Sequence, residues 1–444
     1  MKVTLIRANY SSVWEPQSIM SISSYLKAHG IRTQILDGFF ETNEQIYSKL
    51  SDSGIIGFSG TTPQLPHILK MAHDIKMMWP EKKTVAGGFG VSLQPQMVMG
   101  NPDFDHIVAG EGEESMLQIA LGNETKKLVS HLPMNIDDIP FADRDFDLER
   151  YISIAKRDEG RRVTSVVTQR GCVFNCTFCG EGQYGTIWRK YDENATPQRP
   201  VRFRGRNAKL VVQEMKQVRD KFDIEFFKTS DAETNPTRAH FINLCKEMVE
   251  QKLKTPWGCN MRVDKVDDEM CDWAVRANCQ EFWMGVESAS PEILQHINKG
   301  ITVKMIKNAF KVSKKYGIIR RTYSFIGTPL ETFDTIKQTE ALIDELDPEV
   351  YGVCILCPYP GTTYYKPEYD NLDWSQIDEY SNTIWSTENM TNEELRNEQY
   401  RLINKYKGKL ANNFNKKFKS GIISQSGRVL DSLQHLRQHE MRFQ

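Results

Sequence analysis

Short apolar runs alternate with amphipathic segments twice along this chain, and this alternation constrains the fold more than any other feature. In the first half, the apolar runs VTLIR, IRTQILD, IIGFSG, KTVAGG and HIVAG are separated by segments with apolar residues at helical spacing. Parallel strands need crossover connections, and helices then cover both faces of the sheet. The first half therefore predicts an α/β fold with a doubly wound parallel sheet.

Small and polar residues follow several of these predicted strands. In open α/β sheets, ligands bind beyond the carboxyl ends of the strands. Glycine lets a bulky cofactor approach the backbone, and hydroxyl groups can bond to it; tight structural turns are the alternative. No glycine-rich dinucleotide fingerprint follows the first strand, which argues against a nicotinamide cofactor. The candidate ligand-binding residues are Ser59, Thr61, Thr62, Gly87, Gly88, Gly110 and Glu111.

The second half repeats the alternation as six strand–helix units between residues 161 and 370. Six units favour an open barrel with its active residues at the carboxyl ends of the strands. Each polar residue at such an end could singly be a turn residue or a helix cap. The candidates at these ends are Cys172, Cys176, Cys179, Asp231, Glu233, Arg262, Glu287, Ser288, Thr328 and Cys357.

Three cysteines, Cys172, Cys176 and Cys179, lie in one glycine-flanked loop after the first strand of the second half. Thiolates at this spacing can bind three corners of an iron–sulfur cubane and leave the fourth iron open. A structural zinc site is the less favoured alternative, because it would need a fourth ligand that the neighbouring sequence does not supply. Phe178 could shield a cluster from water or pack in the core.

The overall composition excludes several classes of protein. The 57 Lys and Arg residues almost cancel the 58 Asp and Glu residues, so the charge balance does not indicate a nucleic-acid partner, although the segment after Arg401 is basic. No apolar stretch is long enough for a membrane span, and the start does not read as a secretory signal. The nine cysteines do not form a disulfide-framework pattern. We therefore expect a cytoplasmic protein.

The motif Cys172-x3-Cys176-x2-Cys179, with Phe178 before its last cysteine, resembles the signature of the radical S-adenosylmethionine (SAM) enzymes. The stretches FFKTSDAE, WGCNMRVD, WMGVESAS, INKGIT, FIGTPLET and PYPGT, together with VAGGFGVS and VAGEGEES, resemble the branch with an N-terminal cobalamin-binding domain. The resemblance implies a Rossmann- or flavodoxin-like cobalamin-binding domain at 1–125, a linker at 126–160, a partial TIM barrel of radical SAM type at 161–370, and a helical C-terminal region at 371–444.

The resemblance also implies the cofactors and their ligands. A 4Fe–4S cluster on the three cysteines would bind SAM through its open iron, and a one-electron reductant such as flavodoxin or ferredoxin would trigger release of a 5′-deoxyadenosyl radical. Cobalamin would occupy the candidate residues of the first half. The implied SAM-site residues are Phe178, Asp231, Glu233 and Arg262 around the cluster and the methionyl part, and Glu287 and Ser288 near the ribose. Cys357 would either face the active site as a hydrogen donor or be a buried core thiol.

The Asp-x-His-x-x-Gly motif of histidine-binding cobalamin modules is missing, because Asp105 and His106 are adjacent. The favoured function is a cobalamin-dependent radical SAM methyltransferase that acts on an unactivated carbon of a small molecule, lipid or peptide. A radical SAM cyclase or oxidative rearrangement enzyme, or one that has lost cobalamin, is the alternative. A tRNA methylthiotransferase is disfavoured because no cysteine precedes Cys172. A non-catalytic iron–sulfur protein is the last alternative.

Overall fold

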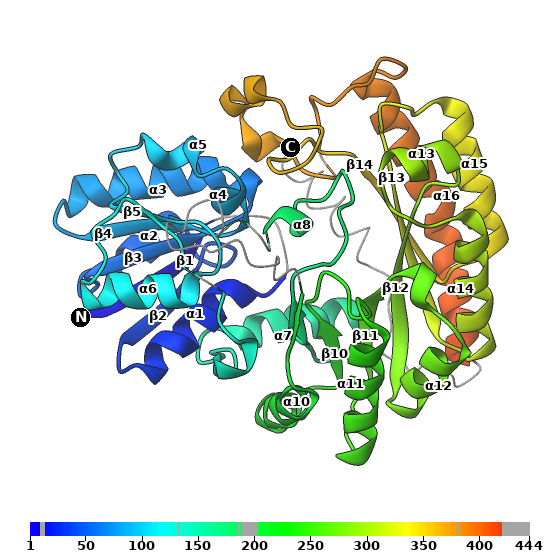
Figure 1. Cartoon of the computed structure of the whole chain (residues 1–444), viewed down its shortest axis with the longest axis horizontal. Helices are drawn as coiled ribbons and strands as arrows, with labels where there is room; N and C mark the ends of the chain where they lie inside the picture. The colour runs from blue at the N-terminus through cyan, green and yellow to red at the C-terminus, as the bar shows by residue number, and fades with distance from the viewer. Residues whose placement is uncertain (9–13, 132, 185–186, 188–202, 381, 420–444) are drawn as a thin grey trace. The chain divides into compact units, whose positions relative to one another are not determined.

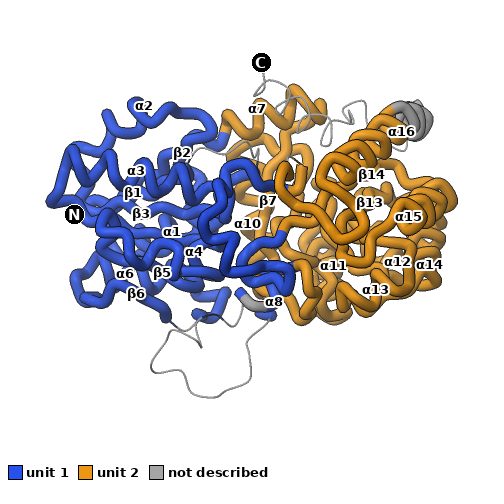
Figure 2. The backbone as a smooth tube through the Cα atoms, turned by 90° about the horizontal axis from the view of Figure 1, so that it is seen from above, with its two compact units in different colours: residues 1–148, 179–204, 358–378 blue, residues 149–178, 205–357, 379–444 orange. Residues whose placement is uncertain are grey.

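The computed structural model describes residues 1–8, 14–131, 133–184, 187, 203–380 and 382–419 (Figure 1). They form two compact units, which Figure 2 shows in two colours. The N-terminal unit comprises Met1–Leu148, Cys179–Arg204 and Pro358–Asp378, and the barrel unit comprises Glu149–Phe178, Gly205–Cys357 and Glu379–Gln444. The sequence predicted contiguous domains, whereas two later segments of the chain fold with the N-terminal unit.

The N-terminal unit is built on a six-stranded, wholly parallel sheet in the order β2-β1-β3-β4-β5-β6. The chain turns outward from β1 in both directions, which is the doubly wound arrangement that the sequence predicted. The strands are β1 (Lys2–Arg7), β2 (Arg32–Asp37), β3 (Ile55–Ser59), β4 (Lys83–Gly87), β5 (His106–Val108) and β6 (Leu128–Val129). The helices are α1 (Gln17–Ala28), α2 (Asn43–Tyr47), α3 (Leu65–Met78), α4 (Phe89–Leu93), α5 (Gln96–Met99) and α6 (Gly112–Leu121).

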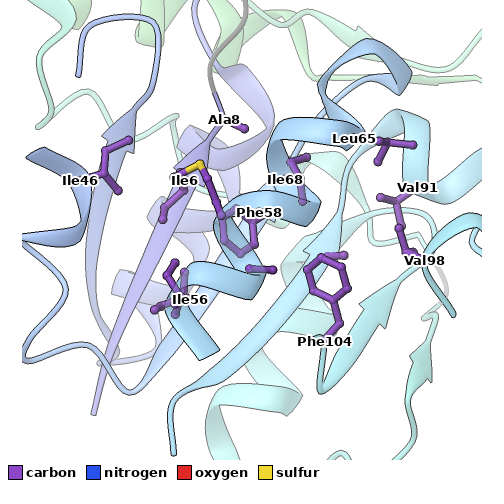
Figure 3. Close-up of a cluster of buried hydrophobic side chains, with 14 of the residues drawn as sticks. Ile6, Ala8, Ile46, Ile56, Phe58, Leu65, Ile68, Val91, Val98 and Phe104 are labelled. Atoms are coloured by element: carbon purple, nitrogen blue, oxygen red, sulfur yellow. The ribbon is translucent and has the colours of Figure 1, made fainter. Parts of the chain in front are cut away.

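Two apolar cores cover the two faces of this sheet. Successive side chains of a strand point to opposite faces, so Val3 and Leu5 of β1 join one core, while Ile6 joins the other. The core that contains Ile6 is completed by Ile68 of α3 and by further residues shown in Figure 3. The other core is covered by α1 and α6. Both faces are therefore dry, as a parallel sheet requires.

The segment 126–160, which the sequence predicted to be a linker, is more regular than expected. Val129 of β6 accepts a hydrogen bond from the Ala109 amide and so extends the sheet. A short 3-10 turn, η2 (Ile136–Asp138), follows, and then the helix α7 (Leu148–Glu159). Tyr151 and Ile152 of α7 are buried. The acidic residues of this segment hid the helical spacing of its few apolar side chains.

The barrel unit contains a second parallel six-stranded sheet, in the order β14-β13-β12-β11-β10-β7. Because β14 and β7 stand at the two ends of that order, the sheet is an open half-barrel, as predicted. Its strands are β7 (Val163–Val166), β10 (Phe226–Thr229), β11 (Trp257–Met261), β12 (Cys279–Glu287), β13 (Ile319–Ile326) and β14 (Val350–Ile355). The short strands β8 (Gln169–Arg170) and β9 (Arg204–Gly205) form a separate pair.

Polar caps fix where the barrel helices begin. A side-chain oxygen of the residue before each of five helices accepts a backbone N–H from its first turn, which satisfies a donor that the helix itself leaves unpaired. These caps are Asn207, Thr237, Asp267, Thr302 and Thr332. The helices they begin are α10 (Ala208–Phe222), α11 (Arg238–Glu250), α12 (Asp268–Arg276), α14 (Val303–Lys315) and α15 (Phe333–Leu346), and α13 (Pro291–His296) lies between α12 and α14.

The predicted helical C-terminal region contains one long helix, α16 (Asn392–Lys419). Tyr406 of α16 packs edge-on against Tyr351 of β14, with 4.8 Å between the ring centroids. Arg401 and Lys405 form ion pairs with Glu340 of α15. This part of the predicted basic segment therefore pairs within the chain, and the rest, residues 420–444, lies outside the described residues. Within the described ranges, none of the helices has the length and hydrophobicity that a bilayer crossing requires.

Candidate active site and cofactor-binding residues

The cysteine loop follows β7 and β8 at the carboxyl end of the barrel sheet. Cys172 and Cys176 belong to the barrel unit and are half-buried, and Cys179 begins the segment that folds with the N-terminal unit. The loop is held by two hydrogen bonds to the turn after α13. The Thr177 amide donates to the Ile297 carbonyl at 3.0 Å, and the Asn298 side chain donates to the Asn175 carbonyl at 2.9 Å.

Positive charge lies beside this loop. The guanidinium carbon of Arg262 lies 3.5 Å from the centroid of the Phe174 ring. Lys299 lies 5.8 Å from the centroid of the Phe178 ring. Burial raises the pKa of the Cys176 thiol, and the charges of Lys299 and Arg262 act in the opposite direction. Cations of this kind favour thiolates, the form in which cysteine binds iron.

The donor set of the loop fits a cubane better than a single ion. Among the residues that the structure describes, no group of three or more His, Cys, Asp or Glu side chains is placed to hold one metal ion. A cubane holds its thiolates at separate corners, so Cys172, Cys176 and Cys179 need not converge on one point as zinc ligands do.

Glu233 and Arg262, both predicted from the sequence, are brought to the side of the cysteine loop. One carboxylate oxygen of Glu233 lies 3.6 Å from the Cys172 sulfur, and the other lies 4.0 Å from Arg262 Nε. Burial raises the pKa of Glu233 to about 7, against the lowering effect of Arg262. Arg262 also donates to Asp264 and to the Lys299 carbonyl. This group offers a carboxylate and a guanidinium beside a cluster ligand.

Asp231, the third predicted residue here, has a different environment. Its carboxylate accepts hydrogen bonds from the amide and hydroxyl of Thr168, the amide of Gln169 and the hydroxyl of Thr234. Burial raises its pKa to about 6, and these four donors act in the opposite direction. The contacts tie the loop after β10 to the backbone that leads into the cysteine loop. Asp231 therefore positions that backbone.

Glu287 and Ser288 lie at the end of β12, where the pairing with β13 is irregular. Glu287 has a φ of +62°, a conformation that costs a non-glycine residue free energy. Its carboxylate is paired with Lys299 at 2.6 Å. The Ser288 hydroxyl is buried and accepts the Ser290 amide at 3.1 Å. Sequence reasoning missed Lys299, whose only signal was its place in the INKGIT turn.

Two of the remaining candidates pack against other side chains of the barrel unit. Phe178 contacts Phe325 of β13, with 4.6 Å between the ring centroids. The Cys357 sulfur is buried and lies 3.3 Å from the side-chain nitrogen of Asn382, which favours the core-thiol alternative. Cys354, on β14, is half-buried instead. The Tyr380 hydroxyl interacts with Cys354, and this contact together with burial raises the pKa of the phenol.

A pocket opens at the carboxyl ends of β3, β4 and β5 in the N-terminal unit. Of the residues predicted for a cofactor here, Ser59, Gly87, Gly88 and Gly110 line it, with apolar walls from α1 and α6. Ser59 shares a hydrogen bond with Ser18 at 3.0 Å. Gly88 has a φ of +94°, and a Cβ there would lie 2.5 Å from the Gly60 nitrogen, so only glycine fits. Such a pocket suits an apolar group that approaches the backbone closely.

The other predicted residues of this set lie beside the pocket or away from it. Thr61 precedes the 3-10 turn η1 (Thr62–Gln64), and its amide donates to the Gln64 side chain. Thr62 is buried within that turn. Glu111 is ion-paired with Arg204. Sequence reasoning also missed Tyr184, which lines the pocket from a segment far along the chain.

Family models match both units. The B12 binding domain matches residues 3–120, and the Radical SAM superfamily matches residues 166–343. The anaerobic magnesium-protoporphyrin IX monomethyl ester cyclase of Rubrivivax gelatinosus is 26% identical over 86% of this chain and 72% of its own length. The cytidylyl-2-hydroxyethylphosphonate methyltransferase of Streptomyces wedmorensis is 23% identical over 73% of this chain and 71% of its own length.

Two solved structures share the fold. The radical S-adenosylmethionine methyltransferase TsrM from Kitasatospora setae, with tryptophan and a SAM analogue bound, gives a TM-score of 0.65 at 19% identity over 81% of this chain and 74% of that one. The cobalamin-dependent S-adenosylmethionine radical enzyme OxsB gives a TM-score of 0.63 at 18% identity, over 92% of this chain and 61% of that one. The two family models imply a 4Fe–4S cluster, SAM and cobalamin as cofactors. The chain therefore belongs to the radical SAM enzymes that carry an N-terminal B12-binding domain.

Proposed function

We propose that this enzyme transfers a methyl group to an unactivated carbon of a small-molecule, lipid or peptide substrate. The observation that carries the proposal is the presence in one chain of two sites: the glycine-lined pocket of the B12-binding domain, and the cysteine loop with Arg262 and Glu233 beside it. Methyltransferases among the relatives of this chain support it.

The side chains of the barrel unit would bind and orient the cofactors. Bound together, the cofactors supply a radical able to abstract hydrogen from an unactivated carbon and a source of methyl groups. Cys172, Cys176 and Cys179 would hold the cluster. Arg262 would bind the carboxylate of SAM through its planar fork of donors, and Glu233 would bind the ammonium.

The neighbouring residues would fix this geometry. Glu287 and Ser288 would approach the ribose of SAM, with Lys299 holding the Glu287 carboxylate in place. Asp231 would position the backbone before the cysteine loop rather than bind SAM itself, because its oxygen atoms are occupied by backbone and hydroxyl donors of the barrel unit. Phe178 and Phe325 would keep water from the reacting atoms.

The pocket of the N-terminal unit would hold cobalamin. Gly87, Gly88 and Gly110 would let it approach the backbone, and Ser59 would offer a hydroxyl group. Thr61, Thr62 and Glu111 would support the loops around the pocket rather than line it.

The wider setting is also part of the proposal. A one-electron donor such as flavodoxin or ferredoxin would reduce the cluster. The nine cysteines are free of disulfides, which suits a reducing, cytoplasmic location. The near-neutral charge balance and the ion pairs of α16 with α15 do not favour a nucleic-acid substrate.

The test uses enzyme purified without oxygen and reconstituted with iron, sulfide and hydroxocobalamin. It is incubated with reductant, SAM labelled with a trideuterated methyl group, and a metabolite or peptide extract. We expect a product that carries the labelled methyl group, together with 5′-deoxyadenosine, by mass spectrometry. Formation of 5′-deoxyadenosine without any labelled product would contradict methyl transfer.

A radical cyclase or oxidative enzyme with the same cofactors is the second candidate. The relative from Rubrivivax gelatinosus, which is named as a cyclase, favours it. In the same experiment this activity would give a dehydrogenated or oxygenated product without the label. The two outcomes are therefore distinguished by one measurement.

A further inference from the structure

One wall of the pocket in the N-terminal unit comes from outside the B12-binding domain. The other lining residues lie between Leu5 and Met116, on the strands, helices and loops of that domain. Tyr184 belongs instead to the short helix α8 (Glu181–Tyr184), which begins two residues after Cys179. A cluster ligand and a residue of the cobalamin pocket are thus five residues apart in the sequence.

Tyr184 is held in the pocket wall by three contacts within the N-terminal unit. Its hydroxyl donates to the Gly110 carbonyl at 3.1 Å. Its ring stacks on Phe89 of α4, with 5.1 Å between the centroids and 25° between the planes. Its own carbonyl accepts the amide of Ile187 at 3.2 Å, and Ile187 is buried. Gly110 and α4 both follow strands whose ends form the pocket.

The chain between Cys179 and Tyr184 has little freedom to move. A Cβ on Gly180 would lie 2.6 Å from Leu93 Cδ1 and 3.2 Å from Phe89 Cζ, so the backbone of Gly180 is pressed against α4. The Tyr184 amide donates to the Gly180 carbonyl at 2.9 Å and closes the single turn of α8. A change in the position of Cys179 is therefore passed to Tyr184 through a packed turn rather than absorbed by a slack loop.

We propose that Tyr184 couples the occupancy of the cobalamin pocket to the assembly of the iron–sulfur cluster. Binding of the Cys179 thiolate to iron fixes the start of α8, and this holds Tyr184 in the pocket wall that cobalamin contacts. Cobalamin in the pocket in turn holds Tyr184, and so favours the loop conformation that binds the cluster. The two effects are equal in free energy, because binding linkage is reciprocal.

The inference rests on the cofactors of the family and not on the proposed methyl transfer. A failure of methyl transfer leaves it intact, and its own failure leaves methyl transfer intact. Tyr184 is a positioning residue in this account, since it acts on the cluster through Cys179.

The experiment measures the dissociation constant of hydroxocobalamin by equilibrium dialysis under anaerobic conditions. Two samples of the full chain are compared: one with its cluster reconstituted, and one from which a chelator has removed the iron. We expect the natural enzyme to bind hydroxocobalamin at least about fivefold more tightly with its cluster, the lower end of typical coupling between sites. By reciprocity, saturating hydroxocobalamin should slow the loss of iron to the chelator.

Three variants test the role of Tyr184. In Tyr184→Ala the ratio of the two dissociation constants should fall to about one, and hydroxocobalamin should no longer protect the iron. Tyr184→Phe keeps the stacking on Phe89 and loses the hydrogen bond to Gly110, so its ratio should lie between those of the natural enzyme and Tyr184→Ala. This variant tests the proposal if Tyr184→Ala folds poorly. Tyr47→Phe is the matched control, because its hydroxyl bonds to Asp74 on α3 rather than to the pocket, and it should keep the natural ratio. The proposal is overturned if the ratio of the two dissociation constants is one in the natural enzyme. It is also overturned if both Tyr184 variants keep the ratio of the natural enzyme.

Discussion

The guanidinium of Arg262 lies over the ring of Phe174, with 3.5 Å between the guanidinium carbon and the ring centroid. Phe174 stands between Cys172 and Cys176 in the sequence, so the stacking places a permanent positive charge beside the cluster loop. Two further contacts, to Asp264 and to the Lys299 carbonyl, fix the side chain. This arrangement presents a preorganised cation where we propose that the carboxylate of SAM binds.

Replacing Arg262 should weaken SAM binding. Arg262→Gln removes a charge-assisted pair of hydrogen bonds, so we expect the dissociation constant of SAM to rise by about 10- to 100-fold. Arg262→Lys keeps the positive charge but loses the planar fork of donors. Its dissociation constant for SAM should therefore lie between those of the natural enzyme and Arg262→Gln. Equilibrium dialysis against cluster-loaded enzyme measures the effect. Arg276→Gln, which breaks an exposed pair with Asp272, is the control. An unchanged SAM affinity in Arg262→Gln would show that SAM is bound elsewhere.

The two kinds of cysteine should respond differently to substitution. Cys179→Ala should lose bound iron and sulfide and abolish the reductive cleavage of SAM, because a cubane site with only two thiolates no longer holds its cluster. Cys357→Ala should keep the full iron content, since its thiol is buried beside Asn382. Iron and sulfide analysis with quantification of 5′-deoxyadenosine gives both readouts. Normal cleavage by Cys179→Ala would refute the assignment of this cysteine as a ligand.

Filling the pocket of the N-terminal unit should reduce cobalamin binding without unfolding the domain. A Cβ at Gly87 would make only ordinary contacts, the nearest at 3.6 Å, so Gly87→Val should fold. Its extra methyl groups would overpack the cofactor site at a cost of about 1–3 kcal/mol, which is a loss of affinity of about 5- to 150-fold. Gly100→Val, at a position with open space around it, is the control. Equal hydroxocobalamin affinity in both variants would exclude this pocket as the site.

Glu331 should make the stability of the cofactor-free protein depend on pH. Burial in the loop after β13 raises the pKa of this carboxyl to about 7, from 4.5 for a free side chain. Because the folded state favours the protonated form, the contribution to stability is complete below about pH 4.5 and is lost as the pH rises to about 7. Its size is on the order of 3 kcal/mol.

Glu331→Gln removes this titration. The free energy of unfolding of Glu331→Gln minus that of the natural protein, measured in urea, should therefore increase from pH 5 to pH 8, which are chosen to bracket the raised pKa of about 7. Glu388→Gln, on an exposed side chain, should show no such trend. A parallel pH dependence for the natural protein and Glu331→Gln would mean that Glu331 is ionised in the folded state at both pH values.

Local sequence pattern was enough to predict the two parallel sheets and the cysteine loop. Strand and helix periodicity is set by residues a few positions apart, and the spacing of Cys172, Cys176 and Cys179 is itself the chemical motif. Glu233 and Arg262 were also predicted, because residues at the carboxyl ends of parallel strands meet at one edge of the sheet.

Only the tertiary structure decided which charged side chains are hydrogen-bonded or ion-paired within the protein, and which distant segments pack in one unit. The sequence could not show that Asp231 is saturated by Thr168, Gln169 and Thr234, or that Lys299 is paired with Glu287. Nor could it place Tyr184 in the wall of a pocket formed mainly by residues from the first quarter of the chain. Most of these contacts join residues on different elements of the chain, and the side chains that meet there leave no periodic pattern. They depend on the packing of the whole unit, which local propensity does not encode.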